Sequence, residues 1–265
     1  MPSRSDSSSL FGLSPDQEYW RFRGLEAAYD EGTIEVLDQI RVMPGWRTLE
    51  VGAGGGSIAV ALHSRAGSVY ALDNDTSYIE DFRSNTFKVI ESDLVHALEQ
   101  QLIPDNLDLV HCRLFLDLFE SPEAVVGDLS SLLRSGGWLF IEEFDDVTLE
   151  ECLVGGRAAD LHKLVVGAKR RAWESKGFDG HIGRKLPGLF SLAGLDQIES
   201  RCSTRIRHSG TNERLGWQRS LEGMYRELLQ SGLKQSDYAE YAALLESKGF
   251  QYFAPLMVRV TGRKR

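Results

Sequence analysis

The chain has 265 residues, enough for one large domain, and 42% of them are hydrophobic, which is ample for a buried core. Its net charge of −9 argues against a nucleic-acid partner, because phosphate binding needs a basic stripe and the basic ending at 263–265 is short. Apolar stretches of transmembrane length and a signal-peptide core are both missing from the sequence, so we expect no membrane partner.

The cysteines and histidines point to no metal site. Cys112, Cys152 and Cys202 are widely spaced without a C-x-x-C pair, and the six histidines form no H-E-x-x-H motif. This usage predicts neither a disulfide framework nor a zinc site. It fits the reducing cytoplasm, where we expect the protein to work.

The N-terminal part is predicted to be a disordered tail followed by helices. Residues 1–13 are serine-rich, which is typical of disorder. Ser14-Pro15 is a helix start, because serine caps and proline suits the first helical position. A second helix carries Ile34 and Ile40 and ends at Pro44-Gly45. The range 14–43 is therefore expected to be a helical segment.

Strands and helices alternate from residue 47 to residue 146, which predicts a parallel sheet covered on both faces. The predicted strands are 47–52, 68–73, 87–92, 107–112 and 138–144, and the helices are 56–65, 76–83, 94–101 and 122–134. Ser135-Gly136-Gly137 is expected to end the last of these helices.

The pattern changes after Asp146. It predicts helices within 148–176, 184–193, 212–230 and 236–247, and strands at 196–207 and 252–262. With no linker evident, we expect a single domain over 14–265, with helical insertions at 147–194 and 209–250.

A glycine-rich turn follows the first strand. Glu50 precedes Gly52, Gly54 and Gly56, and such a turn lets a ligand lie on bare backbone amides at a helix N-terminus. The alternative is a turn that only tightens a strand–helix corner. A dinucleotide-binding turn needs glycine at position 57, which is Ser57 here. The Glu50 carboxylate would repel a pyrophosphate but suits a cationic ligand.

Acidic residues end the next two strands. Asp73 lies 21 residues beyond Gly52 (73 − 52), close to the spacing of an acidic group that accepts hydrogen bonds from ribose hydroxyls. Asp93 can accept from an exocyclic adenine amine, with Leu94 beside it. Ligands bind at this edge of a parallel sheet, so the sequence predicts a nucleoside-containing ligand there.

This set of features resembles the class I S-adenosylmethionine (SAM)-dependent methyltransferases. Segments similar to bacterial small-molecule methyltransferases of natural-product pathways are 44–47, 109–113, 135–138, 141–143, 183–187 and 260–263. The resemblance implies an α/β fold, Rossmann-like and doubly wound, with a mostly parallel seven-stranded sheet, an antiparallel last strand and helical lid insertions. The short segment between the glycine turn and the second strand, and Leu118 where relatives often have histidine, depart from that pattern.

The resemblance also implies the cofactor, SAM, and the residues that contact it. Tyr19 would lie on a lid, and His111, Cys112 and Arg113 would lie beside the sulfonium. The complete implied set is Tyr19, Glu50, Gly52, Ala53, Gly54, Asp73, Asn74, Asp93, Leu94, His111, Cys112 and Arg113.

Methyl transfer can be catalysed largely by orientation, and a base is needed only if the acceptor must lose a proton. His181, in a glycine-rich loop, is the first candidate base, and a surface role is the alternative for it. Glu143 is the second candidate. The expected partner is a small-molecule methyl acceptor, and a homo-oligomer is left open.

Three other interpretations stay open at this point. The enzyme could couple methylation to cyclisation or rearrangement of the acceptor. It could be an NAD-dependent oxidoreductase, against which Ser57 and Glu50 argue. It could also be a binding protein with a vestigial pocket.

Overall fold

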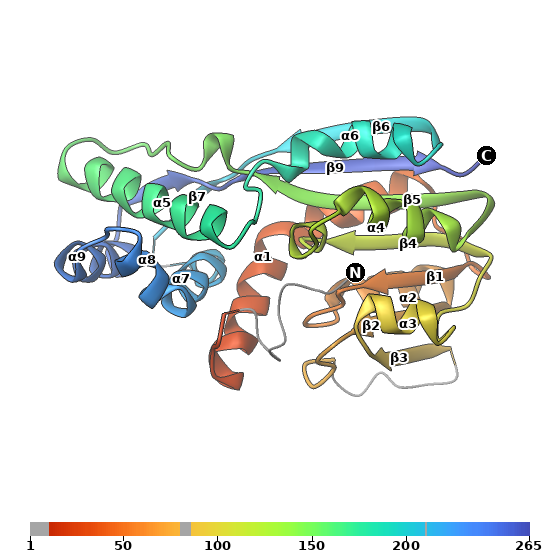
Figure 1. Cartoon of the computed structure of the whole chain (residues 1–265). Coiled ribbons are helices and arrows are strands. Elements are labelled where there is room, and N and C mark those ends of the chain that lie inside the picture. The colour runs from red at the N-terminus through yellow and green to blue at the C-terminus, as the bar shows by residue number, and fades with distance from the viewer. Residues whose placement is uncertain (1–10, 80–85, 210) are drawn as a thin grey trace.

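The centre of the molecule is a seven-stranded sheet with the strand order β3-β2-β1-β4-β5-β9-β6 (Figure 1). The computed structural model describes residues 11–79, 86–209 and 211–265. The strands of this sheet are β1 (Arg47–Val51), β2 (Ser68–Asp73), β3 (Phe87–Glu91), β4 (Leu107–Arg113), β5 (Leu133–Asp145), β6 (Asp196–Ser203) and β9 (Leu256–Arg263). Strands β1 to β5 run parallel, and β9 runs antiparallel to both β5 and β6. The mostly parallel sheet with an antiparallel last strand is confirmed.

Helices cover both faces of the sheet. Helix α2 (Ser57–Ala66) and the C-terminal half of α1 (Pro15–Gln39) pack on one face. Helices α3 (Leu94–Glu99), α4 (Pro122–Ser131) and α6 (Ile182–Leu192) pack on the other. Side chains alternate along a strand, so the strands supply apolar residues to both cores, as a parallel sheet requires.

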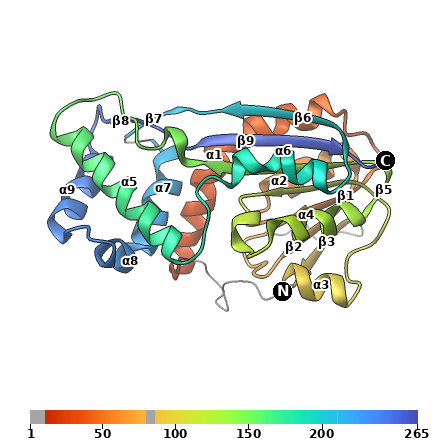
Figure 2. The same ribbon diagram turned by 45° about the horizontal axis from the view of Figure 1, so that its top comes forward.

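Four further helices form a group that we call the helical cap: α5 (Arg157–Ser175), α7 (Glu213–Gly223), α8 (Tyr225–Gln230) and α9 (Gln235–Glu246). A small antiparallel pair, β7 (Ile206–His208) with β8 (Gln251–Phe253), adjoins them. The cap has its own apolar core. Figures 1 and 2 both show it beyond the sheet, on the side to which the carboxyl ends of the parallel strands point.

Helix α1 joins the sheet to the cap. It begins with the predicted capping box, in which Ser14 N donates to Gln17 Oε1 at 3.1 Å and Gln17 N donates to Ser14 Oγ at 3.4 Å. Its N-terminal half packs along α7 so closely that a Cβ atom at Gly24 would clash with the backbone of Gly216. Helix α1 therefore spans the opening between the main sheet and the helical cap.

Three predictions about helices and their ends were wrong. Residues 14–43 hold one continuous helix rather than two, and Gly32 in its middle makes room for the Arg259 guanidinium. Ser135-Gly136-Gly137 lies inside β5, at a register shift against β4, and Gly136 and Gly137 form backbone hydrogen bonds with Lys264 instead of ending α4. Residues 76–79 form a turn rather than a helix, and 80–83 lie outside the described residues.

The strands predicted at 196–207 and 252–262 each divide into two. Their first and second parts join different sheets, so β6 and β9 extend the main sheet while β7 and β8 pair beside the cap. Of the predicted disordered tail, 1–10 lie outside the described residues, whereas Phe11 stacks on Trp173 with ring centroids 5.8 Å apart. In the described part of the chain, no helix is long and apolar enough to cross a membrane.

Candidate functional site

The turn after β1 exposes backbone that side chains would block. Gly52 and Gly54 have φ angles of 68° and 52°, a region that favours glycine. A Cβ atom would lie 2.8 Å from the Phe115 ring at Gly52 and 2.9 Å from the Phe22 ring at Gly54. These two positions therefore require glycine for both conformation and space, and they form the floor of a cavity.

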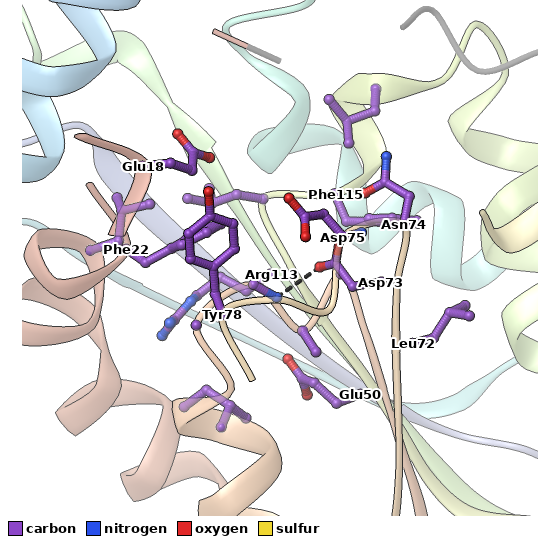
Figure 3. A pocket seen from close by; sticks show the side chains of 18 of the residues that line it. Glu18, Phe22, Glu50, Leu72, Asp73, Asn74, Asp75, Tyr78, Arg113 and Phe115 are labelled. Carbon is purple, nitrogen blue, oxygen red and sulfur yellow. Dashed lines mark hydrogen bonds between the residues drawn. The ribbon is translucent and has the colours of Figure 1, made fainter. Parts of the chain in front are cut away.

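That cavity, which we call the turn cavity, has a volume of about 230 Å³ and lies at the carboxyl ends of β1, β2 and β4. Figure 3 shows side chains from these strands and from α1 converging on it. Phe22 of α1 contacts Tyr78 edge to face, with ring centroids 5.2 Å apart. The sequence-predicted residues that line it are Glu50, Gly52, Ala53, Gly54, Asp73, Asn74, Asp93, Leu94 and Arg113.

Asp73 is fixed in place by backbone amides. Its Oδ2 accepts from Gly54 N at 2.7 Å and its Oδ1 accepts from Asp75 N at 3.0 Å. Burial raises the pKa of this carboxyl, against these two hydrogen bonds, which lower it. Each oxygen has a second lone pair for a ligand hydroxyl. Asp93 is partly engaged as well, because its side chain caps α3 by accepting from His96 N at 2.9 Å.

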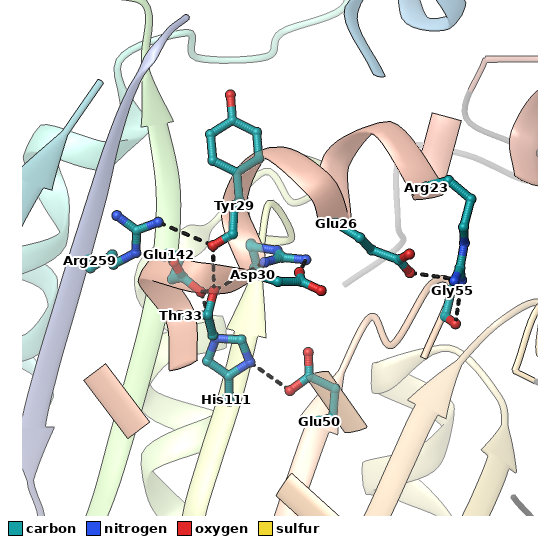
Figure 4. A network of polar contacts seen from close by, with 11 residues as sticks. Arg23, Glu26, Tyr29, Asp30, Thr33, Glu50, Gly55, His111, Glu142 and Arg259 are labelled. Carbon is teal, nitrogen blue, oxygen red and sulfur yellow. Dashed lines mark hydrogen bonds and ion pairs between the residues drawn. The ribbon is translucent and has the colours of Figure 1, made fainter. Parts of the chain in front are cut away.

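A buried charge network lies beneath the cavity floor (Figure 4). His111 places Nδ1 2.6 Å from Glu50 Oε2 and Nε2 3.1 Å from Glu142 Oε1. Burial alone would lower the pKa of His111, but the charges and hydrogen bonds of the two carboxylates raise it to about 9. The imidazolium is therefore the form that lies between Glu50 and Glu142, and it holds Glu50 in place.

His111 and Cys112 do not line the turn cavity, although the resemblance implied that they would. The His111 side chain is fully buried below Glu50, and Cys112 points to the other face of the sheet, into the core under α3, α4 and α6. Neighbouring residues of a strand face opposite sides of the sheet, which explains why Cys112 points away from the face on which His111 lies. Arg113, at the end of the strand, does reach the cavity and donates to Asp30 at 2.8 Å and to Thr33 at 3.0 Å.

Helix α1 covers the turn cavity with a face other than the one predicted. Its lining residues are Glu18, Arg21, Phe22, Leu25 and Glu26. Glu18, Arg21, Phe22 and Leu25 follow the i, i+3, i+4, i+7 spacing of one helix face, and this periodicity is the signal that could have found them. Tyr19 lies off that face, is 39% exposed and stacks edge-on against Trp20 at 5.4 Å. Arg23 fastens the helix to the turn by donating to Gly55 O at 3.0 Å.

A second cavity, which we call the cap cavity, has a volume of about 150 Å³ and lies between the sheet edge and α5 and α7. It adjoins the turn cavity, because both are lined by Phe11, Arg21, Leu25, Leu114 and Leu118. Aromatic side chains such as Trp173 and Trp217 line it together with a few polar groups. The helices that supply these walls lie within the ranges predicted as helical, 148–176 and 212–230.

Of the two candidate bases, only Glu143 lines the cap cavity. Its Oε1 accepts from Phe115 N at 2.8 Å and from Leu116 N at 2.6 Å. Burial raises its pKa to about 8, against these two hydrogen bonds. His181 instead places Nδ1 2.8 Å from Asp145 Oδ1, beside Arg184, and lines a small depression that adjoins the cap cavity but not the cap cavity itself.

Comparisons with known proteins agree with this geometry. Residues 49–141 match the family model described as a methyltransferase domain. A probable cobalt-precorrin-6B C(15)-methyltransferase (decarboxylating) of Sulfolobus acidocaldarius is 28% identical over 57% of this chain and 76% of its own length. A ubiquinone biosynthesis O-methyltransferase of Paracidovorax citrulli is 28% identical over 39% of this chain, and the match spans about half (46%) of that relative.

Solved structures show the same fold. A SAM-dependent methyltransferase from Archaeoglobus fulgidus superposes with a TM-score of 0.52 at 16% identity, covering 93% of this chain and 99% of that one. Phosphoethanolamine N-methyltransferase 2 of Haemonchus contortus, in complex with SAM, gives a TM-score of 0.56 at 13% identity, covering 94% of this chain and 56% of that one. Residues 49–141 therefore form a methyltransferase domain, and the chain has the fold of the SAM-dependent methyltransferases among its structural neighbours.

Proposed function

We propose that this enzyme transfers the methyl group of SAM, bound in the turn cavity, to a small-molecule acceptor in the cap cavity. The observation that carries the proposal is that the two cavities adjoin and share lining residues, so that two ligands would meet in the opening between them. An in-line displacement needs this arrangement, with the attacking atom and the transferred group held face to face.

The residues of the turn cavity fit SAM. The two glycines leave bare amides, Asp73 offers lone pairs for ribose hydroxyls, and Glu50 places a carboxylate near the turn. SAM, when bound, supplies a methyl group already activated on a sulfonium. The proposed contact set is Glu50, Gly52, Ala53, Gly54, Asp73, Asn74, Asp93, Leu94 and Arg113, with Phe22 and Tyr78 added from the structure.

Glu143 is the base that we retain in the proposal. Its carboxyl faces the acceptor side and its pKa of about 8 is near that of a useful proton acceptor, whereas His181 lies outside both cavities. Helix α1 and the helical cap would exclude water from the opening. The secondary-metabolite role and the cytoplasmic location remain proposals, the latter supported by the unpaired thiols of Cys112, Cys152 and Cys202.

Transfer of a labelled methyl group tests the proposal. The purified enzyme is incubated with SAM labelled in its methyl group and a bacterial cell extract, which is then separated into small molecules, nucleic acid and protein. We expect label in the small-molecule fraction, and much less of it in a reaction with Asp73→Ala enzyme at a limiting concentration of SAM. Label confined to nucleic acid or protein would contradict a small-molecule acceptor.

A further inference from the structure

Arg207 of β7 lines the cap cavity with a buried guanidinium, only 3% of the residue being exposed. Its Nη2 donates to the Tyr29 hydroxyl, and the Tyr252 phenol lies nearby. Its Nε is buried and has no hydrogen-bond partner. One donor of this buried cation is therefore unused, and the residue that carries it lines the cap cavity.

Arg207 also has no counterion in the described part of the chain. The other basic side chains of this cavity are paired, Arg21 with Glu18 at 2.7 Å and Lys169 with Asp146 at 2.6 Å. The groups beside it are phenols, and burial raises the pKa of both Tyr29 and Tyr252, so they stay neutral. A buried charge without an opposite charge is costly unless a ligand supplies one.

The acidic residues of the cap cavity are engaged elsewhere. Asp117 accepts from Trp173 Nε1 and from Asp179 N, both at 2.6 Å. Asp179 pairs with Lys185 at 2.5 Å. Asp146 pairs with Lys169, and burial raises the pKa of Glu143 to about 8, so this carboxyl is largely protonated at neutral pH. Among the described residues, Arg207 is therefore the lining cation of this cavity that has no acidic partner.

We propose that Arg207 binds a carboxylate of the methyl acceptor, which makes the acceptor a small aromatic carboxylic acid. The planar guanidinium matches the geometry of a carboxylate. A cavity of about 150 Å³ holds one benzene-sized ring, and aromatic walls such as Trp173 suit a ring. This inference rests on the proposed function, because it assigns the occupant of the cap cavity.

The test measures binding to enzyme loaded with S-adenosylhomocysteine, by calorimetry. The probes are matched pairs: benzoate with benzamide, 4-hydroxybenzoate with 4-hydroxybenzamide, and phenylacetate with phenylacetamide. We expect an acid to bind at least about tenfold more tightly than its amide, the worth of a charged hydrogen bond. Arg207→Met should reduce that ratio to about one, and Arg207→Lys should keep part of it.

The matched control is Arg205→Met, two residues away, because Arg205 pairs with Glu31 and lines a different cavity. It should leave the ratio unchanged. Binding of S-adenosylhomocysteine to each variant shows that the variant is folded. Equal affinity for acid and amide, a ratio unchanged by Arg207→Met, tighter binding of phenyl phosphate than of benzoate, or no binding of any acid would each overturn the inference. Failure of the wild-type enzyme to bind S-adenosylhomocysteine would instead refute the proposed function.

Discussion

At the scale of single residues, the site depends on side chains that backbone amides hold rigidly. Asp73 accepts from Gly54 N and Asp75 N, so its carboxylate is held in place where it lines the turn cavity. The carboxylate of Glu50 is held by a side chain instead, the His111 imidazole below it. A ligand that meets such groups loses little affinity to reorganisation of the protein.

Asp73→Ala should weaken binding of S-adenosylhomocysteine by about tenfold to a hundredfold, because a hydrogen bond to a charged group is lost. Calorimetric titration measures the affinity. Asp128→Ala serves as the control, since Asp128 is exposed on α4 and lines neither cavity, so this variant should bind as the wild type does. Unchanged affinity in Asp73→Ala would remove this residue from the proposed contact set.

Glu143 should make stability depend on pH. Its folded pKa of about 8 exceeds its ordinary value of 4.5, so the folded state holds a proton that the unfolded state releases between these values. The contribution of Glu143 to the free energy of unfolding is therefore complete below about pH 4.5. It declines as the pH rises to about 8, by up to about 1.4 kcal/mol per pH unit. Urea unfolding of the wild type and of Glu143→Gln measures it.

The free energy of unfolding of the wild type minus that of Glu143→Gln should fall across this window and stay constant above it. The exposed Glu123→Gln variant should follow the wild type at every pH. A difference between wild type and Glu143→Gln that does not change with pH would show that Glu143 titrates at its ordinary value.

At the scale of elements, α1 is the piece that sequence patterns described least well. Its helix start was predicted correctly from Ser14 and Pro15, because capping is a local interaction. Its continuity through Gly32 was not, because that depends on the Arg259 side chain of a distant strand. Its cavity-facing side likewise depends on how it packs against α7.

Two helical glycines should respond oppositely to the same substitution. Gly24→Ala should destabilise the protein and weaken binding of S-adenosylhomocysteine, because the added methyl clashes with the Gly216 backbone and displaces α1. Gly127→Ala in α4 has open space around it and should stabilise the protein by about 0.5–1 kcal/mol through helix propensity. Thermal unfolding measures both. A stabilising Gly24→Ala would contradict the close packing of α1 on α7.

At the scale of the whole molecule, the site exists because two separately packed parts meet. The sheet end supplies the turn cavity, and the helical cap supplies the walls of the cap cavity. The two ligands are therefore recognised by different parts of the chain, and one can be blocked without the other.

Ser220→Phe should separate the two functions. Ser220 lines the cap cavity but not the turn cavity, so a phenyl ring there should fill the acceptor space and leave the affinity for S-adenosylhomocysteine within about twofold. Methyl transfer into the small-molecule fraction should be lost. Ser191→Phe is the control, because Ser191 is exposed on α6 and its hydroxyl also bonds a carbonyl four residues back. Normal transfer by Ser220→Phe would place the acceptor elsewhere.

The sequence by itself determined the parallel sheet, the glycine turn and the acidic strand ends at Asp73 and Asp93, because these depend on local periodicity and on which residues can occupy a tight turn. It also pointed to the family. Only the tertiary structure decided that His111 and Cys112 lie outside the cavity, that Phe22 rather than Tyr19 covers it, and that Arg207 lines the acceptor space. Those outcomes depend on which face of each element meets a partner far away in the chain, and spacing along one segment cannot fix that.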